Sequence, residues 1–419
     1  DALGNVVQSV DPLGNVTSLE WDSLGNLAAS TSPEGSRDEW LYDGEGNLIG
    51  HTDPLGHTEA WEWGAAGSLD AHVDLAGART EYAYDAVGNL LAETDPLGRT
   101  TSYERDAHGN VIARTTSGGA RWEYGWDALD RLISVKTPRG YERQLGYDEA
   151  GNAVSDADNM GLRANYAYDA LGRMVEQRYG SQRASTWQYD AAGNLVGETD
   201  ARGSATSHGY DLVGRLTETR DASGAETRWA YDVRGNVIAQ GGTAAEMRAW
   251  AWDAAGNLVA ETDGAGKTTA YEWDGDGRLV GAVAPTGART AYRWDAAGNL
   301  ASITDSLGNI ESREHDPLGR TTKITDRRGA ATMYEYDAAG QLTGVTQPSG
   351  ARTIYDYDVD GNLTEVTDAL GRVMRYGYDA EGGLISIESP SGALEEFVRD
   401  PAGRVIASVD GAGAETRYN

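Results

Sequence analysis

The chain has 419 residues, of which 66 are acidic and 35 are basic, so its formal net charge is −31. Such a surface repels phosphate backbones and anionic membranes, which argues against nucleic acid and lipid as partners. The sequence has no cysteine, which excludes disulfides and thiolate metal sites, and no apolar run long enough to insert into a bilayer.

From the first residue onward, the sequence is one repeat of 21 residues. The segment YDAVGNL, which begins at Tyr84, recurs as WDSLGNL from Trp21 and WDAAGNL from Trp252. When positions are counted from the aspartate, position 1 is Asp in 19 of 20 repeats and position 4 is Gly in 19 of 20, with Gly64 and Asp130 as the exceptions. No insertion breaks the phase, so a repeat architecture is expected.

Each repeat contains two turn signals. The first turn spans positions 1–4, and the second turn, DPLG at Asp53 and Asp95, spans positions 11–14. Position 14 is Gly in 18 of 20 repeats, failing only at Gln182 and Ala245. Asp at the start of a turn accepts backbone N–H groups, Pro fixes φ, and Gly supplies the left-handed residue of a hairpin loop. The pattern predicts an all-β fold of tandem antiparallel β-hairpins, with about 40 short strands.

The residues between the turns alternate as strands do. Position 6 is Leu or Val in 17 of 20 repeats, and positions 19 and 21 hold 32 of the 35 aromatic residues. Almost all of these are Tyr or Trp, because the chain has 22 Tyr, 12 Trp and one Phe. A period of two predicts one aromatic face and one small or polar face. Across the first turn we expect position 21 to face position 6, position 19 to face position 8, and position 17 to face position 10.

An odd repeat length conflicts with the period of two. If both turns had the same loop and both strands were regular, the aromatic residues would change face. The sequence therefore predicts a parity change near the second turn, by an even-length loop or a bulge, and a longer connection at positions 12–15 than at positions 2–4.

Forty strands side by side would form a meandering strip roughly 190 Å long and about 20 Å wide. Open sheets of this length curl, so we expect the strip to coil into a hollow shell or spiral. The alternative is a compact stack of hairpins with the aromatic residues in a narrow core.

The pattern Tyr-Asp-x-x-Gly-Asn-Leu, Thr-Asp-Pro-Leu-Gly-Arg-Thr and Tyr-x-Tyr-Asp resembles the YD repeat of Rhs proteins, of the B and C components of Tc-type toxin complexes, and of teneurins. The resemblance covers the whole chain. It implies a strip of hairpins that forms a cocoon, secreted or on the cell surface, which in bacterial members encloses a toxin. It also implies carbohydrate binding in some contexts.

One feature of the bacterial relatives is not found in this sequence. They end the shell with a more complex, aspartate-containing segment, whereas residues 380–419 keep the 21-residue phase, and Asp400 begins a turn in register. We therefore expect residues 1–419 to be one continuous repeat array without a separate catalytic or toxin domain, excerpted from a longer chain. Its partners would be its own flanking regions or an enclosed polypeptide.

Catalytic and metal-binding interpretations of the polar residues are weak. The turn carboxylates could form catalytic pairs or bind calcium, but they occur in every repeat and each turn offers one dependable carboxylate, so turn capping is favoured. We expect no enzyme activity, no cofactor and no metal site. Most of the histidines are interpreted as surface residues, with His208 and His315 replacing aromatic residues; the six are His51, His57, His72, His108, His208 and His315.

The aromatic stripe is the feature with binding potential. Tyr and Trp rings stack on sugars and on apolar polypeptide, although packing within the sheet is the favoured interpretation. The candidate glycan-stacking residues come from the part of the chain richest in Trp: Trp250, Trp252, Tyr271, Trp273, Tyr292 and Trp294. The sequence thus predicts a non-enzymatic scaffold that encloses or displays a cargo, with a carbohydrate-binding adhesin or surface fibre as the alternative.

Overall fold

The structure, a computed structural model, describes residues 1–65, 67–242 and 246–418. Within these residues all regular structure is strand: 40 antiparallel strands belong to one sheet, and no helix occurs. The predicted all-β fold of tandem hairpins is confirmed. The turn expected around Ala245 lies outside the described residues.

Each repeat contributes two strands, one after each turn. The strands that follow a first turn are β1 (Gln8–Val10), β3 (Leu27–Thr31), β5 (Leu48–Thr52), β7 (Leu69–Val73), β9 (Leu90–Thr94), β11 (Val111–Thr115), β13 (Leu132–Lys136), β15 (Ala153–Asp158), β17 (Met174–Tyr179), β19 (Leu195–Thr199), β21 (Leu216–Arg220), β23 (Val237–Gly241), β25 (Leu258–Thr262), β27 (Leu279–Val283), β29 (Leu300–Thr304), β31 (Thr321–Thr325), β33 (Leu342–Thr346), β35 (Leu363–Thr367), β37 (Leu384–Glu388) and β39 (Val405–Val409). Those that follow a second turn are β2 (Val16–Trp21), β4 (Arg37–Tyr42), β6 (Thr58–Trp63), β8 (Arg79–Tyr84), β10 (Thr100–Arg105), β12 (Arg121–Trp126), β14 (Glu142–Tyr147), β16 (Arg163–Tyr168), β18 (Ser185–Tyr189), β20 (Ala205–Tyr210), β22 (Glu226–Tyr231), β24 (Arg248–Trp252), β26 (Thr268–Trp273), β28 (Arg289–Trp294), β30 (Ile310–His315), β32 (Ala331–Tyr336), β34 (Arg352–Tyr357), β36 (Val373–Tyr378), β38 (Leu394–Arg399) and β40 (Glu415–Arg417).

The two kinds of turn have the same backbone geometry. In the first turn at Asp85, its N–H donates to the carbonyl of Asn89 at 3.0 Å, and in the second turn at Asp95 its N–H donates to the carbonyl of Arg99 at 3.0 Å. In both turns the fourth residue, a glycine with positive φ, donates back to the carbonyl of the aspartate. The prediction of a longer connection at positions 12–15 is therefore wrong.

The aspartate side chain caps its own turn, as predicted. Asp85 Oδ1 accepts the backbone N–H of Val87 at 3.0 Å and that of Asn89 at 2.9 Å. Its other oxygen, Oδ2, accepts the side-chain amide of Asn89 at 2.9 Å. One carboxylate thus satisfies three donors, which explains why Asp recurs at position 1 and why Asn so often follows at position 5.

The parity change occurs as a β-bulge in the strand after the first turn. Tyr84 pairs with Leu90, which confirms the predicted pairing of positions 21 and 6. The register then shifts, so that Tyr82 pairs with Glu93 and Leu91 is left as the extra residue. Position 19 therefore faces position 9 and position 18 faces position 10, and the pairings predicted for positions 19 with 8 and 17 with 10 are wrong. An extra residue within a strand restores the face as effectively as a longer loop would.

The bulge leaves a carbonyl at position 6 that a side chain satisfies. Across the second turn the paired residues end at position 8, as in Ala92 with Ser102, so the ladder does not extend to position 6. The polar tip of the aromatic residue at position 21 donates to this carbonyl. These donors are Trp21, Trp63, Trp126, Tyr168, Tyr189, Tyr210, Tyr231, Trp252, Trp273, Tyr336 and Tyr357.

Two arginines at position 21 also donate to the position 6 carbonyl. Arg105 Nε donates to the Leu90 carbonyl at 2.9 Å, and Arg399 Nε donates to the Leu384 carbonyl at 2.9 Å. In these two repeats the aromatic ring is replaced but the donor is kept. The only phenylalanine, Phe397, lies at position 19, which does not contact this carbonyl.

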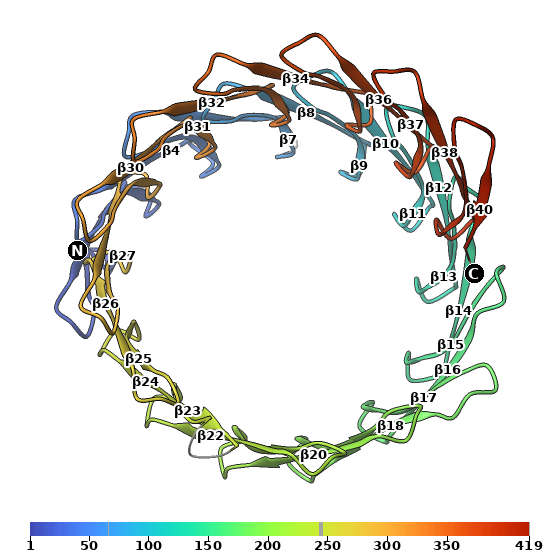
Figure 1. Cartoon of the computed structure of the whole chain (residues 1–419), viewed down its shortest axis with the longest axis horizontal. Helices are drawn as coiled ribbons and strands as arrows, with labels where there is room; N and C mark the ends of the chain where they lie inside the picture. Colours follow the sequence, from blue (N-terminus) through green and yellow to red (C-terminus); the bar gives the residue numbers. More distant parts are fainter. Residues whose placement is uncertain (66, 243–245, 419) are drawn as a thin grey trace. The chain divides into compact units, whose positions relative to one another are not determined.

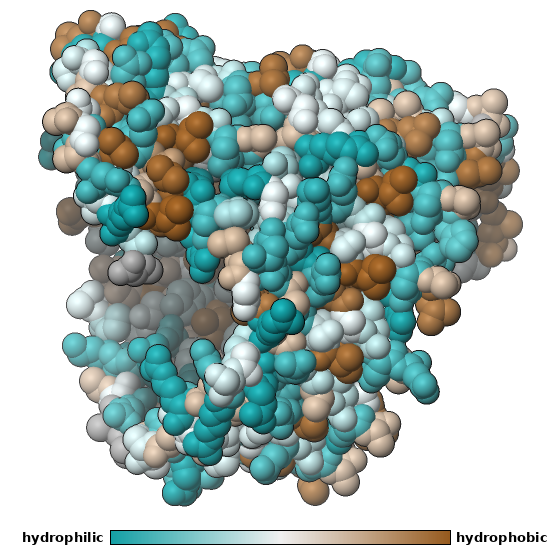
Figure 2. Space-filling view, turned by 90° about the vertical axis from the view of Figure 1, so that its right-hand side faces the viewer, coloured by the Kyte–Doolittle hydropathy of each residue, from teal (hydrophilic) through white to brown (hydrophobic). Residues whose placement is uncertain are grey.

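The sheet has two different faces and no thick core. On β8, Thr80, Tyr82 and Tyr84 are half-buried, whereas the alternate residues are exposed; we call the side that carries positions 17, 19 and 21 the aromatic face. The opposite face carries ion pairs such as Arg37 with Glu20 at 2.6 Å. Among the described residues no large side chain is fully buried, and Figure 2 shows apolar residues scattered between hydrophilic ones on the face in view.

The chain divides into two compact units. Unit 1 comprises Asp1–Val10, Val16–Glu142 and Tyr292–Asn419, and unit 2 comprises Asp11–Asn15 and Arg143–Ala291. Within unit 1, strands distant in sequence lie side by side, with β30 to β38 beside β4 to β12 (Figure 1).

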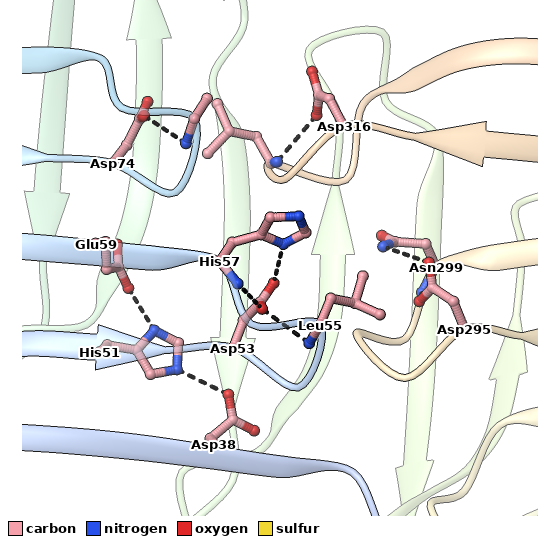
Figure 3. A network of polar contacts seen from close by, with 12 residues as sticks. Asp38, His51, Asp53, Leu55, His57, Glu59, Asp74, Asp295, Asn299 and Asp316 are labelled. Carbon is pink, nitrogen blue, oxygen red and sulfur yellow. Dashed lines mark hydrogen bonds and ion pairs between the residues drawn. The ribbon is translucent and has the colours of Figure 1, made fainter.

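The two stretches of unit 1 meet through their turns. Second turns of residues 16–142 contact first turns of residues 292–419 at a constant offset of 242 residues, which we call the layer seam. Arg99 donates to Gln341 at 2.8 Å, and the Gly118 N–H donates to Asp360 at 2.8 Å. Figure 3 shows the turn at Asp53 facing that at Asp295.

Arg139 makes the most extensive contact of the layer seam. Its guanidinium donates to both carboxylate oxygens of Asp379 at 2.8 and 2.9 Å and contacts Glu381 at 3.0 Å, and its backbone N–H also donates to Glu381 at 2.6 Å. The three side chains are only 15–19% exposed. Burial alone would raise the pKa of Asp379, but the hydrogen bonds from Arg139 and the turn backbone hold that pKa below its usual value.

We expect Tyr210→Phe to destabilise the chain by about 1 kcal/mol, because the bulge carbonyl of Leu195 loses its donor. The matched control is Tyr82→Phe at position 19, which should cost less than about 0.5 kcal/mol. Urea unfolding of both variants checks this difference. Equal destabilisation of the two variants would show that the carbonyl bond is not what favours tyrosine at position 21.

We expect Arg139→Ala to loosen the layer seam, because it leaves the carboxylates of Asp379 and Glu381 half-buried without their cation. The cost should be about 2–3 kcal/mol. Arg121→Ala, which removes an exposed ion pair with Glu104, should cost less than about 1 kcal/mol. Hydrogen exchange at residues 137–141 and 379–383 should accelerate only in the first variant, and an equal response in both variants would contradict the assignment.

Candidate functional site

The aromatic face is the surface that recurs in every repeat. Its rings are half-buried by their neighbours along the sheet rather than enclosed in a core. On β26 the Trp273 ring pairs with Leu279 across the first turn, and Tyr271 pairs with Ala282. Ring and aliphatic side chains therefore support one another within the sheet, and both rings stay partly exposed.

The structure places the predicted glycan-stacking residues on three strands of the aromatic face. Trp250 and Trp252 lie on β24, Tyr271 and Trp273 on β26, and Tyr292 and Trp294 on β28; all six are half-buried. Tyr292 and Trp294 belong to unit 1 and the other four to unit 2, so the set is divided between the two units.

These residues differ in whether their polar group donates a hydrogen bond to a backbone carbonyl. The indole N–H of Trp252 donates to the Val237 carbonyl at 2.8 Å, and that of Trp273 donates to the Leu258 carbonyl at 2.7 Å. Both rings are therefore anchored to the backbone through the bulge. Within the described residues no such bond is made by Trp250, which lies at position 19 opposite Glu261. Glycan binding by any of the six stays a prediction.

A row of alternating acids and histidines crosses the aromatic face near the N-terminus. His51 Nε2 lies 2.8 Å from Asp38, and its Nδ1 lies 2.8 Å from Glu59 (Figure 3). The second oxygen of Glu59 lies 3.2 Å from His72 Nε2. We call these four residues, on β4 to β7, the histidine row.

Aromatic rings flank the histidine row. Trp40 stacks on His51 with 5.5 Å between ring centroids, and Trp61 stacks on His72 at 5.0 Å. The His51 side chain is 14% exposed, so it is half-buried among these neighbours. The histidine row was not predicted from the sequence, because the expected pairing placed position 8 opposite the aromatic residue at position 19. The bulge places position 9 there instead. His208, at position 19 itself, does replace an aromatic residue and contacts Thr219 opposite.

The pKa and the hydrogen bonds of His51 do not suit a catalytic base. Burial would lower the pKa of His51, but the hydrogen bonds with Asp38 and Glu59 outweigh it and raise the pKa above its ordinary value. The cation is therefore favoured, and both ring nitrogens are already engaged. A general base at neutral pH needs a free nitrogen and a neutral ring.

Many turn carboxylates accept hydrogen bonds that lower their pKa. Hydrogen bonds from the side chain and backbone of Asn89 hold the pKa of Asp85 below its usual range. The corresponding hydrogen bonds from Asn26 and Asn47 lower the pKa of Asp22 and of Asp43. A general acid of the glycosidase kind needs a raised pKa, which these turns oppose.

Residues 1–65, 67–242 and 246–418 contain no group of three or more His, Asp or Glu side chains arranged to hold a metal ion. They also contain no helix that could span a bilayer.

Comparison with known families matches both halves of the chain. The RHS Repeat profile matches residues 1–37, several overlapping stretches from 84 to 206, and residues 210–244. The Teneurin YD-shell profile matches residues 257–398. No curated protein sequence matches the chain.

Solved structures share the fold at low sequence identity. The TcdB2-TccC3-Cdc42 crystal structure aligns with a TM-score of 0.58 and 15% identity, over 95% of this chain and 28% of that one. The Photorhabdus luminescens Tc holotoxin pore with a mutated TccC3 aligns with a TM-score of 0.60 and 15% identity, over 96% of this chain and 26% of that one. This chain thus spans about a quarter of the length of each structure. At such identity the match shows the fold alone.

The repeat, its bulge and its capped turns run through the segments that these profiles match, and the same bulge occurs between them, at Tyr42 and Trp63. The chain belongs to the YD-repeat, or Rhs-repeat, proteins.

Proposed function

We propose that the chain is a non-enzymatic structural scaffold, the wall of a shell that encloses or displays a polypeptide cargo at or outside the cell surface. The observation that carries the proposal is that most repeats use their own polar groups for structure. The turn aspartate caps its own turn, as at Asp85, and the side chain at position 21 commonly donates to the bulge carbonyl, as Tyr210 does. What remains available in every repeat is the half-exposed aromatic face.

The layer seam supports a wall built from a coiled strip. Within unit 1 the contacts recur at 242 residues, or about eleven and a half repeats, so second turns meet first turns each time. A strip that rests on its own distant repeats in constant register is suited to coiling. We infer that residues 1–419 act as one repeat array with no catalytic domain of their own.

The similar solved structures support a cargo role by analogy of fold. They contain TcdB2 together with TccC3, in one case TccC3 without its hypervariable C-terminal region. By analogy, the cargo of this chain would be a flanking region or an enclosed polypeptide. Rings at position 19, which are not tied to the bulge carbonyl, would offer apolar surface to an unfolded segment.

One observation favours carbohydrate binding as the second candidate. Trp250 is half-buried, its indole N–H makes no hydrogen bond within the described residues, and it lies beside Trp252, whose ring is fixed by its bond to Val237. A fixed ring next to an adaptable one is an arrangement that stacks on sugar rings.

Titration of the chain with an unfolded polypeptide and, separately, with a panel of soluble glycans distinguishes the two candidates. With tryptophan fluorescence as the signal, we expect a saturable change with reduced, carboxymethylated polypeptide and none with glycans. Trp250→Ala should weaken the polypeptide interaction about threefold to tenfold, and the matched control Tyr84→Phe should not. A response to glycans alone would favour the adhesin, and a lack of response to polypeptide would contradict a cargo-holding face.

The histidine row predicts pH-dependent stability. Because the pKa of His51 is raised in the folded chain, its stabilisation is fully present below the unfolded value of about 6.5 and is lost as pH rises through the folded pKa. We therefore expect the stability difference between wild type and His51→Gln to shrink as pH rises above about 6.5. Urea unfolding from pH 5.5 to 9 measures it. A difference that is constant, or that grows with pH, would contradict the ionic role of His51.

A further inference from the structure

Two second turns at the layer seam lack the aspartate that caps their neighbours. Position 11 is Thr116 in one and Thr137 in the other, whereas the preceding second turns begin with Asp53, Asp74 and Asp95. In those three turns the aspartate accepts the backbone N–H of position 13, at 2.9, 2.9 and 3.0 Å. Within the described residues the hydroxyls of Thr116 and Thr137 are buried and have no hydrogen-bond partner, so neither threonine caps its own turn.

The opposite layer supplies the two missing caps. In the turn at Thr116 the N–H of position 13 donates to Asp360 at 2.8 Å, and in the turn at Thr137 it donates to Glu381 at 2.6 Å. Asp360 and Glu381 both lie at position 3 of a first turn. The same backbone donor is thus satisfied from within the turn where position 11 is Asp, and from the other layer where position 11 is Thr.

Gly118, at position 13 of its turn, allows the close approach of Asp360. A Cβ added at Gly118 would overlap the carboxylate of Asp360. The φ angle of Gly118 is not positive, so the glycine is needed for space and not for its backbone conformation. In the other turn position 13 is Arg139, which has a side chain, and the acid opposite it is the longer Glu381.

Position 3 of each opposing first turn matches position 11 of the second turn that it faces. At the offset of 242 residues, the pairs of described turns within unit 1 are Asp53 with Ala297, Asp74 with Leu318, Asp95 with Ala339, Thr116 with Asp360, and Thr137 with Glu381. In these pairs an acid stands opposite each threonine, and no acid stands opposite a turn that has its own aspartate.

A slip of one repeat would break this match. Because every repeat has the same turn geometry, the sheet alone does not distinguish the observed offset from one that is 21 residues longer or shorter. The longer offset would place Asp360 against the turn at Asp95, where two carboxylates would compete for one N–H. It would also place Ala402 against the turn at Thr137, whose N–H would lose its acceptor. The shorter offset would place the turn at Thr116 opposite an alanine.

We propose that exchanged turn caps specify which repeats of this chain rest on each other across the layer seam. A threonine at position 11 leaves the N–H of position 13 without an acceptor, and an acid at position 3 of the correct partner turn supplies one. Wrong partners are penalised in both directions, by an unsatisfied donor or by two facing carboxylates. The exchange therefore sets the register between layers whose sheet-forming residues are nearly identical.

Hydrogen exchange of the two turns, residues 116–120 and 358–362, tests the proposal in the full chain. Thr116→Asp gives its turn a cap of its own and sets a second carboxylate against Asp360, so residues 358–362 should exchange about tenfold faster. Asp360→Ala leaves the Gly118 N–H without an acceptor, so residues 116–120 should exchange about tenfold faster. Both substitutions introduce a residue that other repeats already have at the same position, so the fold should be kept.

Combining the two substitutions distinguishes cap exchange from a simple loss of contact. The double variant recreates the self-capped turn opposite alanine that occurs at Asp95 and Ala339. Both turns should then exchange within about threefold of the wild-type rate, although each substitution alone accelerates exchange. A double variant that exchanges as fast as the faster single variant, or a Thr116→Asp variant with wild-type exchange at residues 358–362, would overturn the proposal.

The matched control is Gln347→Asp. It adds the same aspartate at position 11 of a second turn that does not belong to the layer seam of unit 1, where the side chain is exposed. Both seam turns should keep their wild-type exchange rates in this variant. If it accelerated exchange at the seam as much as Thr116→Asp does, added negative charge and not cap exchange would be the cause.

Discussion

The β-bulge after each first turn is the feature on which the rest of the structure depends. A sheet has a side-chain period of two, and a repeat of 21 residues would move every aromatic residue to the other face in the next repeat. The extra residue, such as Leu91 in the strand after the turn at Asp85, restores the face once per repeat. Because of it, forty strands share one aromatic face.

The same bulge explains the composition of the chain. It leaves the position 6 carbonyl to be satisfied by a side chain, and an aromatic residue at position 21 can reach that carbonyl only if it carries a donor. Tyr and Trp meet this need and Phe does not, and Arg105 and Arg399 keep the donor without the ring. Hydrogen-bond satisfaction, rather than hydrophobicity alone, selects the residue.

Parts of this architecture could be read from the sequence. The capped turns and the contact of Tyr84 with Leu90 followed from turn chemistry and from the short distance to the loop. The position of the parity change did not, because both turns have nearly the same sequence and the same geometry, so nothing in the loops revealed which strand holds the extra residue. One residue of the sequence does point to the bulge. Arg105 stands where an aromatic residue is usual, and it keeps a hydrogen-bond donor at position 21.

The layer seam and the histidine row could not be predicted for a different reason. Both depend on pairings set by the bulge or by contacts 242 residues apart, and a local pattern carries no information about that offset. With 66 acidic and 35 basic residues, most turns would repel one another when layers meet. The few long cationic or amide side chains at turn tips, such as Arg139 and Arg99, therefore decide where one layer can rest on another. In this chain the nearly invariant residues build the sheet, and the variable tip residues determine how its layers are joined.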